Sequence, residues 1–144
     1  MFSRDAFIKQ FRGVTLGKID NQSSVEEHFQ NETLRPILKL QNDLIIQIFK
    51  NYLIQSKVQF SDLSIDGKMT LVGNAIAKDT QLQNTLKGVI IALFTSNEYL
   101  LYFSIQSAIN KRIRTMLIER IQSQLQLLSF IILLLFSSCS VLIY

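Results

Sequence analysis

The sequence contains few of the side chains on which thiol and disulfide chemistry depends. Its 144 residues include one cysteine, one histidine, one proline and no tryptophan. A single cysteine cannot form a disulfide within the chain. Cys139 lies among serines and aliphatic residues, without a neighbouring base or cation that would activate its thiol. We therefore interpret Cys139 as inert.

Metal and nucleotide sites are not indicated either. A transition-metal site usually takes three or four protein ligands, and one histidine with one cysteine does not supply them. The sequence has no glycine-rich phosphate loop followed by Lys-Ser or Lys-Thr, and no Gly-x-Ser-x-Gly nucleophile motif. We expect no metal and no cofactor.

Long runs of like charge are absent as well. The net charge is +4, but acidic and basic residues alternate in patches along the chain. A basic balance of this size is more typical of a solvated surface than of a nucleic-acid interface. The N-terminus carries Arg4, Asp5 and Lys9 where a secretory signal needs an apolar core, so we expect a protein that is not secreted.

What the chain does contain is helical periodicity, most clearly from Thr33 to Ile54. Apolar residues recur there at three- and four-residue steps, which places them on one stripe of a helix. Thr33 suits the N-cap, and Pro36 would lie in the first turn, where its missing N–H breaks no bond. We expect one long helix whose buried stripe contains Leu34, Ile37, Leu38, Leu44, Ile45, Ile48, Phe49 and Tyr52.

Capping signals divide the rest of the chain into further helices. Ser24 with Glu27 and Thr95 with Glu98 match the capping box, and Asp79 can also cap a helix start. A further start has Ser64 or Asp62 as its cap. The expected helices are Ser3–Phe11, Val25–Gln30, Ile65–Lys78, Thr80–Phe94, Asn97–Ser104 and one from Ala108, which carries Ile109, Ile113, Met116, Leu117 and Ile121 inward.

These patterns predict an all-α fold. With short connections and no convincing strand pair, we expect a single compact bundle of about six helices over residues 1–124. The helix of Asn97–Ser104 carries Tyr99, Leu100, Tyr102 and Phe103 and is apolar nearly all round, which predicts that it is enclosed by the others.

Residues 125–144 form a separate apolar segment. The last 24 residues of the sequence contain no charged side chain. A helix of 20 residues is about 30 Å long, which matches the hydrocarbon core of a bilayer. Basic residues precede the segment and favour a cytoplasmic helical domain by the positive-inside tendency. We interpret 125–144 as a transmembrane tail anchor at the inner membrane.

Two other interpretations of this segment remain open. It could be the terminal core helix of the bundle, although a domain of this size has little room for a helix that is apolar on all sides. It could also be a non-native end, because the composition changes abruptly after Leu128 from Asn, Gln and Lys to Phe, Leu, Ile, Ser and Cys.

The candidate functional side chains are few. His28 and Glu32 stand four residues apart, a spacing at which an imidazole and a carboxylate on a helix can form an acid–base pair or share a metal. The other interpretation of His28 is a partly exposed residue of a helix surface. Lys111, Arg112 and Arg114 form the densest basic cluster, which could contact phosphates or anionic lipid, or simply be a solvated face.

Three stretches of the sequence resemble a known family. FQNETLRPILKLQNDLIIQIF, LKGVIIALFTSNEY and INKRI with ERIQSQLQL are similar to a family of small, all-helical, uncharacterised bacterial proteins sometimes labelled glyoxalase. The similarity covers about Phe29 to Leu128. It implies a helical, cytoplasmic protein of bacterial type. Glyoxalase chemistry would need His and Glu ligands presented from strands, and this chain offers one histidine and no set of strands.

The leading functional interpretation is a non-enzymatic helical interaction module. It would bind a protein partner through its helix faces and contact membrane lipid through residues 125–144. One alternative is a small metal-dependent or acid–base enzyme that uses His28 and nearby carboxylates, as the glyoxalase label suggests. The other is nucleic-acid binding through Lys111, Arg112 and Arg114, which the modest net charge disfavours.

Overall fold

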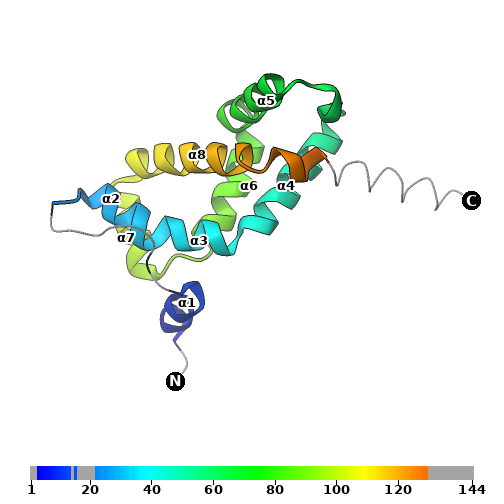
Figure 1. The fold of residues 1–144 in the computed structure, drawn as a ribbon. Coiled ribbons are helices and arrows are strands. Elements are labelled where there is room, and N and C mark those ends of the chain that lie inside the picture. Colours follow the sequence, from blue (N-terminus) through cyan, green and yellow to red (C-terminus); the bar gives the residue numbers. More distant parts are fainter. Residues whose placement is uncertain (1–2, 14, 16–21, 130–144) are drawn as a thin grey trace, which may run out of the picture.

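The computed structural model describes residues 3–13, 15 and 22–129, and in these residues the protein is all-helical (Figure 1). The prediction of an all-α fold is confirmed, but the described residues contain eight α-helices where about six were expected. The elements are α1 (Arg4–Arg12), α2 (Val25–Phe29), the π-helical turn η1 (Gln30–Leu34), α3 (Arg35–Leu40), α4 (Asn42–Gln55), the 3-10 turn η2 (Phe60–Asp62), α5 (Ile65–Lys78), α6 (Thr80–Ile91), α7 (Ser96–Ser104) and α8 (Gln106–Gln122).

Helix α8 organises the packing. It runs across the molecule, with α5 near one edge and α1 at the opposite edge (Figure 1). Ile109, Ile113, Leu117 and Ile121 recur at four-residue steps along α8 and are all buried, as predicted, whereas Met116 is half-buried. Because these four side chains share one face, α8 contributes a continuous apolar ridge to the core and leaves its other faces for polar residues.

The prediction of a single helix from Thr33 to Ile54 is wrong in two places. Its first part belongs to a longer helical run that begins at Val25 and passes through the π turn η1 into α3. Gln41 then separates α3 from α4 with backbone angles of −89° and 5°, and its side-chain amide donates to the Val89 carbonyl of α6 at 3.2 Å. Leu44, predicted to be buried, is exposed.

Pro36 explains the π turn. Inside a helix, proline removes one backbone hydrogen bond and its ring crowds the carbonyl four residues earlier. The turn immediately before Pro36 is widened to the π form, which gives the ring room and keeps the chain helical. Thr33 is therefore not an N-cap. It is buried within η1, and its hydroxyl donates to the Glu98 carboxylate at 2.5 Å.

The predicted caps, in contrast, are present. In each, a side-chain oxygen accepts from a backbone N–H three residues later. The pairs are Ser24 with Glu27 at 3.1 Å, Ser64 with Gly67 at 3.0 Å, Asp79 with Leu82 at 2.9 Å and Thr95 with Glu98 at 3.2 Å. At Thr95 the capping box is complete, since Glu98 also accepts from the Thr95 N–H at 3.0 Å.

Helix α7 is not enclosed, contrary to the prediction. Of its apolar residues, Tyr102 is buried, while Leu100 and Phe103 are 67% and 66% exposed. The helix packs through one side only, with Tyr102 against Phe94 at 5.7 Å between ring centroids. Its other large apolar residues are exposed: Tyr99, Leu100, Leu101 and Phe103.

The predicted membrane segment lies mostly outside the described residues, which end at Ser129. Residues 125–129 are helical; Leu128 is buried in the core, and the Lys68 ammonium donates to the Ser129 hydroxyl at 3.1 Å. Within the described part of the chain, no helix has the length and apolarity that crossing a membrane would require. For residues 130–144 the anchor stays a prediction.

Candidate functional site, a basic groove along α8

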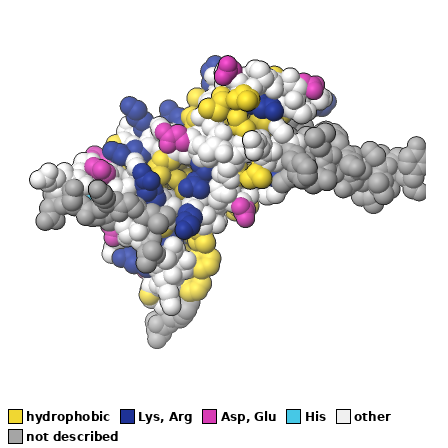
Figure 2. All heavy atoms as spheres, in the orientation of Figure 1, with side chains coloured by type: hydrophobic (Ala, Val, Ile, Leu, Met, Phe, Trp, Pro, Cys, Tyr) yellow, Lys and Arg dark blue, Asp and Glu magenta, His cyan; other side chains and the backbone are white. Residues whose placement is uncertain are grey.

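A groove runs between α8 and the segment α2–η1–α3. It consists of two adjoining hollows of about 520 and 330 Å³ that share Gln30, Met116 and Glu119 in their walls. Figure 2 shows Lys and Arg side chains gathered around a hollow on this face, with apolar atoms at its floor. We call this feature the basic groove.

Arginine side chains are held across the basic groove by neutral partners. Arg112 of α8 donates from Nη1 to the Gln30 side-chain oxygen at 2.5 Å. Nearer the C-terminal end of α8, Arg120 donates from Nη1 to the Asn42 side-chain oxygen at 3.1 Å. The first bond links α8 to η1 in the opposite wall, and the second links α8 to α4. Because an amide oxygen carries no net charge, these bonds fix the guanidinium groups without neutralising them.

The positive charge of the groove is not compensated by ion pairs. Within the described part of the chain, ion pairs closer than 4.0 Å occur at Arg4–Asp5 and Arg12–Glu98, both outside the groove. The groove walls contain four cations, Arg35, Lys111, Arg112 and Arg120, and two carboxylates, Glu26 and Glu119, a formal balance of +2. An anionic ligand would therefore meet unpaired positive charge.

Burial strengthens the attraction that Arg120 would exert on an anion. Loss of water around its guanidinium lowers the pKa of Arg120, although an arginine stays protonated at neutral pH. A charge that has lost part of its hydration interacts more strongly with an anion than a fully solvated one does. Next to it, Leu38 is buried and Met116 is half-buried, so the floor of the groove offers apolar contact beside the charges.

The structure divides the predicted basic cluster. Lys111 and Arg112 line the basic groove, but Arg114 lines a separate small hollow with Ile76 and Lys87 of α5 and α6. The reason is helical geometry: Arg114 is about 200° around the helix from Arg112, hence on the other side. Sequence spacing alone is enough to make this distinction.

Other groove residues were missed at the sequence level. Arg120 lies eight residues after Arg112, with Met116 halfway between them, and this spacing on a helix indicates a common face. The facing residues had no such signal, because Gln30 and Asn42 are 82 and 78 residues away from their arginine partners in the sequence. Only the folded arrangement of α8 against η1 and α4 brings them together.

His28 and Glu32, the predicted acid–base pair, lie in two different helical elements. His28 is half-buried in α2, whereas Glu32 is exposed in the π turn η1, where α-helical spacing does not apply. Among the described residues, no group of three or more His, Cys, Asp and Glu side chains is placed to hold a metal ion. Cys139 lies outside the described residues.

A second cluster of charges is buried at the junction of α1 and α7. The side chain of Arg12 is 5% exposed and that of Glu98 14%, and their Nη1 and Oε1 atoms are 2.6 Å apart. Burial opposes ionisation of Glu98, but the hydrogen bonds from Arg12, Thr33 and Thr95 outweigh it and hold the pKa of Glu98 below its usual value. Both carboxylate oxygens of Glu98 accept hydrogen bonds within the fold, so this cluster attaches α1 to the bundle.

Helix α1 is attached to the bundle at a second point. Arg4 donates to the carbonyl oxygens of Phe94 and Ala92 at 2.9 and 2.8 Å, just beyond the end of α6. Asp5 accepts from the Ser96 N–H at 3.1 Å, at the start of α7. These contacts satisfy backbone groups that helix ends leave open. They are structural, which leaves the basic groove as the candidate functional site.

Comparison with known proteins adds no assignment. No protein-family model, curated protein or solved structure matches this chain. The resemblance to small helical bacterial proteins labelled glyoxalase therefore stays a prediction, as does any activity that this label implies. The chemistry of the basic groove is the basis on which a function can be argued.

Proposed function

We propose that the chain is a non-enzymatic interaction module that binds an acidic segment of a partner protein in the basic groove. The observation that carries the proposal is the state of Arg112 and Arg120. Both are held in place by amide oxygens, and neither has a carboxylate partner among the described residues. Guanidinium groups oriented in this way can donate to carboxylates with little loss of side-chain entropy.

The dimensions of the groove suit a short extended segment. Its α8 wall reaches from Ala108 to Ser123, about 22 Å along the helix axis. An extended chain covers about 3.3 Å per residue, so about seven residues would fill the groove. The apolar floor at Leu38 and Met116 favours a segment that mixes acidic residues with one or two hydrophobic ones.

A protein segment suits the groove better than a nucleic acid does. Glu26 and Glu119 in the walls would repel closely spaced phosphates, whereas a peptide can place its acidic residues away from them. The residues that line the two hollows include no aromatic side chain on which a base could stack. Nucleic acid is therefore an alternative for the binding test to exclude.

We expect the double variant Lys111→Gln with Arg112→Gln to weaken binding of an acidic peptide. The probe is a fluorescein-labelled peptide of about seven residues, mostly glutamate with leucine, matched to the groove. The dissociation constant from fluorescence anisotropy should rise about tenfold, because each partly exposed charge pair contributes roughly 0.5–1 kcal/mol. Salt at about 300 mM should weaken binding to the unmodified protein as well.

The matched control is Lys87→Gln with Arg114→Gln. It removes the same charge, and one of its two positions is on α8, but both residues line the hollow on the other side. This variant should bind the peptide within about twofold of the unmodified protein. If the two double variants weakened peptide binding equally, binding in the basic groove would be rejected in favour of a general attraction by net charge. Tighter binding of single-stranded RNA than of the peptide, with a steep salt dependence, would support the nucleic-acid alternative instead.

We propose further that the apolar segment predicted at 125–144 attaches the module to a membrane through residues 130–144, with the helical domain on the cytoplasmic side. The uncharged run in the sequence supports this. The full chain should stay in the membrane pellet after alkaline extraction, whereas a chain that stops after Ser129 should be soluble and equally helical by circular dichroism. This stop keeps the buried Leu128 and the bond from Lys68 to Ser129. Release of the full chain by alkali would contradict the attachment.

A further inference from the structure

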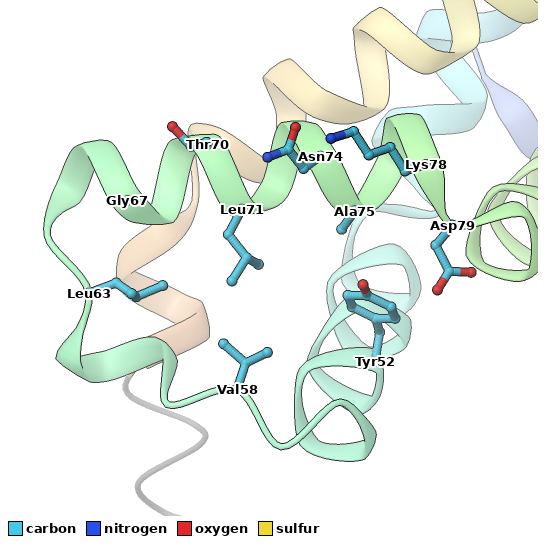
Figure 3. Close-up of a pocket in the computed structure, with 10 residues that line it drawn as sticks. All are labelled: Tyr52, Val58, Leu63, Gly67, Thr70, Leu71, Asn74, Ala75, Lys78 and Asp79. Carbon is cyan, nitrogen blue, oxygen red and sulfur yellow. The ribbon is translucent and has the colours of Figure 1, made fainter.

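A second groove lies between α4, α5 and the connection that joins them. Its volume is about 630 Å³, within the range of about 300–1,000 Å³ typical of small-molecule sites. Tyr52 of α4 stands on one side and α5 on the other, and Val58 and Leu63 of the connection close one end (Figure 3). We call it the α4–α5 groove; it shares no lining residue with the basic groove.

The two ends of the α4–α5 groove differ in chemistry. At one end Val58, Leu63 and Leu71 point toward one another from the connection and from α5 (Figure 3). Beyond this end, the hydroxyl of Tyr52 is directed toward α5, and the side chains of Asn74 and Lys78 lie along the edge of α5 away from Tyr52 (Figure 3). An apolar end joined to a polar end matches an amphiphilic molecule better than a purely polar or purely apolar one.

The polar groups are not engaged by other described residues, and Asn74 and Lys78 are exposed. The ring of Tyr52 packs on Phe49 of the core, with 5.7 Å between centroids, so its hydroxyl has a fixed direction. Among the described residues, none forms a hydrogen bond or ion pair with the Tyr52 hydroxyl, the Asn74 amide or the Lys78 ammonium. Asp79, beside Lys78, is used differently, because its carboxylate caps α6 through the Leu82 N–H.

The charge at this end selects the head group of the ligand. Lys78 supplies a cation without a paired carboxylate, and Tyr52 and Asn74 supply hydrogen-bond donors. The ammonium of Lys78 and the amide of Asn74, which lie along the same edge of α5, complement a carboxylate head (Figure 3). We infer that the α4–α5 groove binds a free fatty-acid-type carboxylate, with its chain on Val58, Leu63 and Leu71 and its head at Lys78. This inference is independent of the proposed peptide binding.

Titration of the full chain with decanoate, below its micelle concentration, tests the inference. Amide shifts in nitrogen–proton correlation spectra should move at Gly67 and Ala75, which line the groove on α5, and yield a dissociation constant. Hexanoate should bind at least tenfold more weakly, because each methylene buried contributes about 0.8 kcal/mol when fully covered. Decanol should bind about threefold to fivefold more weakly than decanoate, as expected for one exposed charge contact.

Two variants place the head and exclude a general charge effect. Lys78→Gln should weaken decanoate about threefold to fivefold and leave decanol unchanged, while Lys87→Gln on α6 should leave both unchanged. Leu63→Ser, at a half-exposed position that can change without loss of core packing, should weaken decanoate and decanol alike. Equal binding of decanoate and decanol, or no shift on α5 with either, would overturn the inference. A normal circular dichroism spectrum for each variant establishes that the protein is folded.

Discussion

Replacing Glu98 by alanine is expected to lower the free energy of unfolding by about 3 kcal/mol, the usual scale for removing one partner of a buried ion pair. Glu98 accepts from Arg12 and Thr33 and closes the capping box with Thr95. Without it, the guanidinium of Arg12 is buried with no counter-charge, and its Nε already lacks a hydrogen-bond partner. Urea denaturation followed by circular dichroism measures the change.

The control for this prediction is Glu119→Ala, which removes an exposed carboxylate on α8 and should cost less than about 0.5 kcal/mol. Measurement at low pH adds a second check. The folded protein holds the pKa of Glu98 below its ordinary 4.5, so the charge-dependent stabilisation is complete above pH 4.5 and is lost as the pH falls through the depressed folded value. The difference between Glu98→Ala and the unmodified protein should therefore shrink in acid. A difference below about 1 kcal/mol at pH 7 would contradict the assigned role.

Replacing Phe94 by alanine should lower the free energy of unfolding by about 4 kcal/mol, as typical for a large aromatic residue in a core. Phe94 is buried and meets Phe29 and Tyr102 in edge-to-face contacts, with 5.4 and 5.7 Å between centroids. It therefore joins α2 to α7 at the end of α6. Loss of its ring removes both aromatic contacts and leaves a cavity between three helices. The midpoint of urea denaturation should fall accordingly.

Phe103→Ala is the matched control for Phe94→Ala. It deletes the same side chain from an outward-facing position on α7 and should change stability by less than about 0.5 kcal/mol. Equal losses in the two variants would mean that α7 is enclosed after all, as its composition first indicated. Little loss at Phe94 would mean that the three aromatic rings do not form part of the core.

Local signals predicted the helix boundaries well where a cap sets them. Helix α5 has the bounds expected from the sequence, Ile65–Lys78, because the Ser64 hydroxyl can bond only to a backbone group a few residues away. Pro36 lies in the first turn of α3, as expected, but it does not mark the start of the helical run. It is typical of a first turn, but it also fits inside a helix when the turn before it widens, and the sequence carries no separate sign of a π turn.

The limits of prediction differ between core and surface. Apolar periodicity identified the buried ridge of α8, since Ile109 and Ile113 repeat at a helical step. The exposure of Leu100 and Phe103 could not be predicted, because whether an apolar helix is covered depends on how many neighbours the rest of the chain supplies. The basic groove could be predicted only in part. Lys111 and Arg112 form a cluster in the sequence, whereas Gln30 approaches them only after folding.

The π turn sets a strict length requirement on the segment that carries it. Deleting one residue from Gln30–Leu34 would turn η1 into ordinary α-helix and rotate everything before it by about 100° relative to α3. Phe29 would then leave the core, where it now meets Phe94. Gln30 and Thr33 belong to the same turn, and they reach Arg112 and Glu98 respectively. The π turn thus sets the register of both the basic groove and the buried charge cluster.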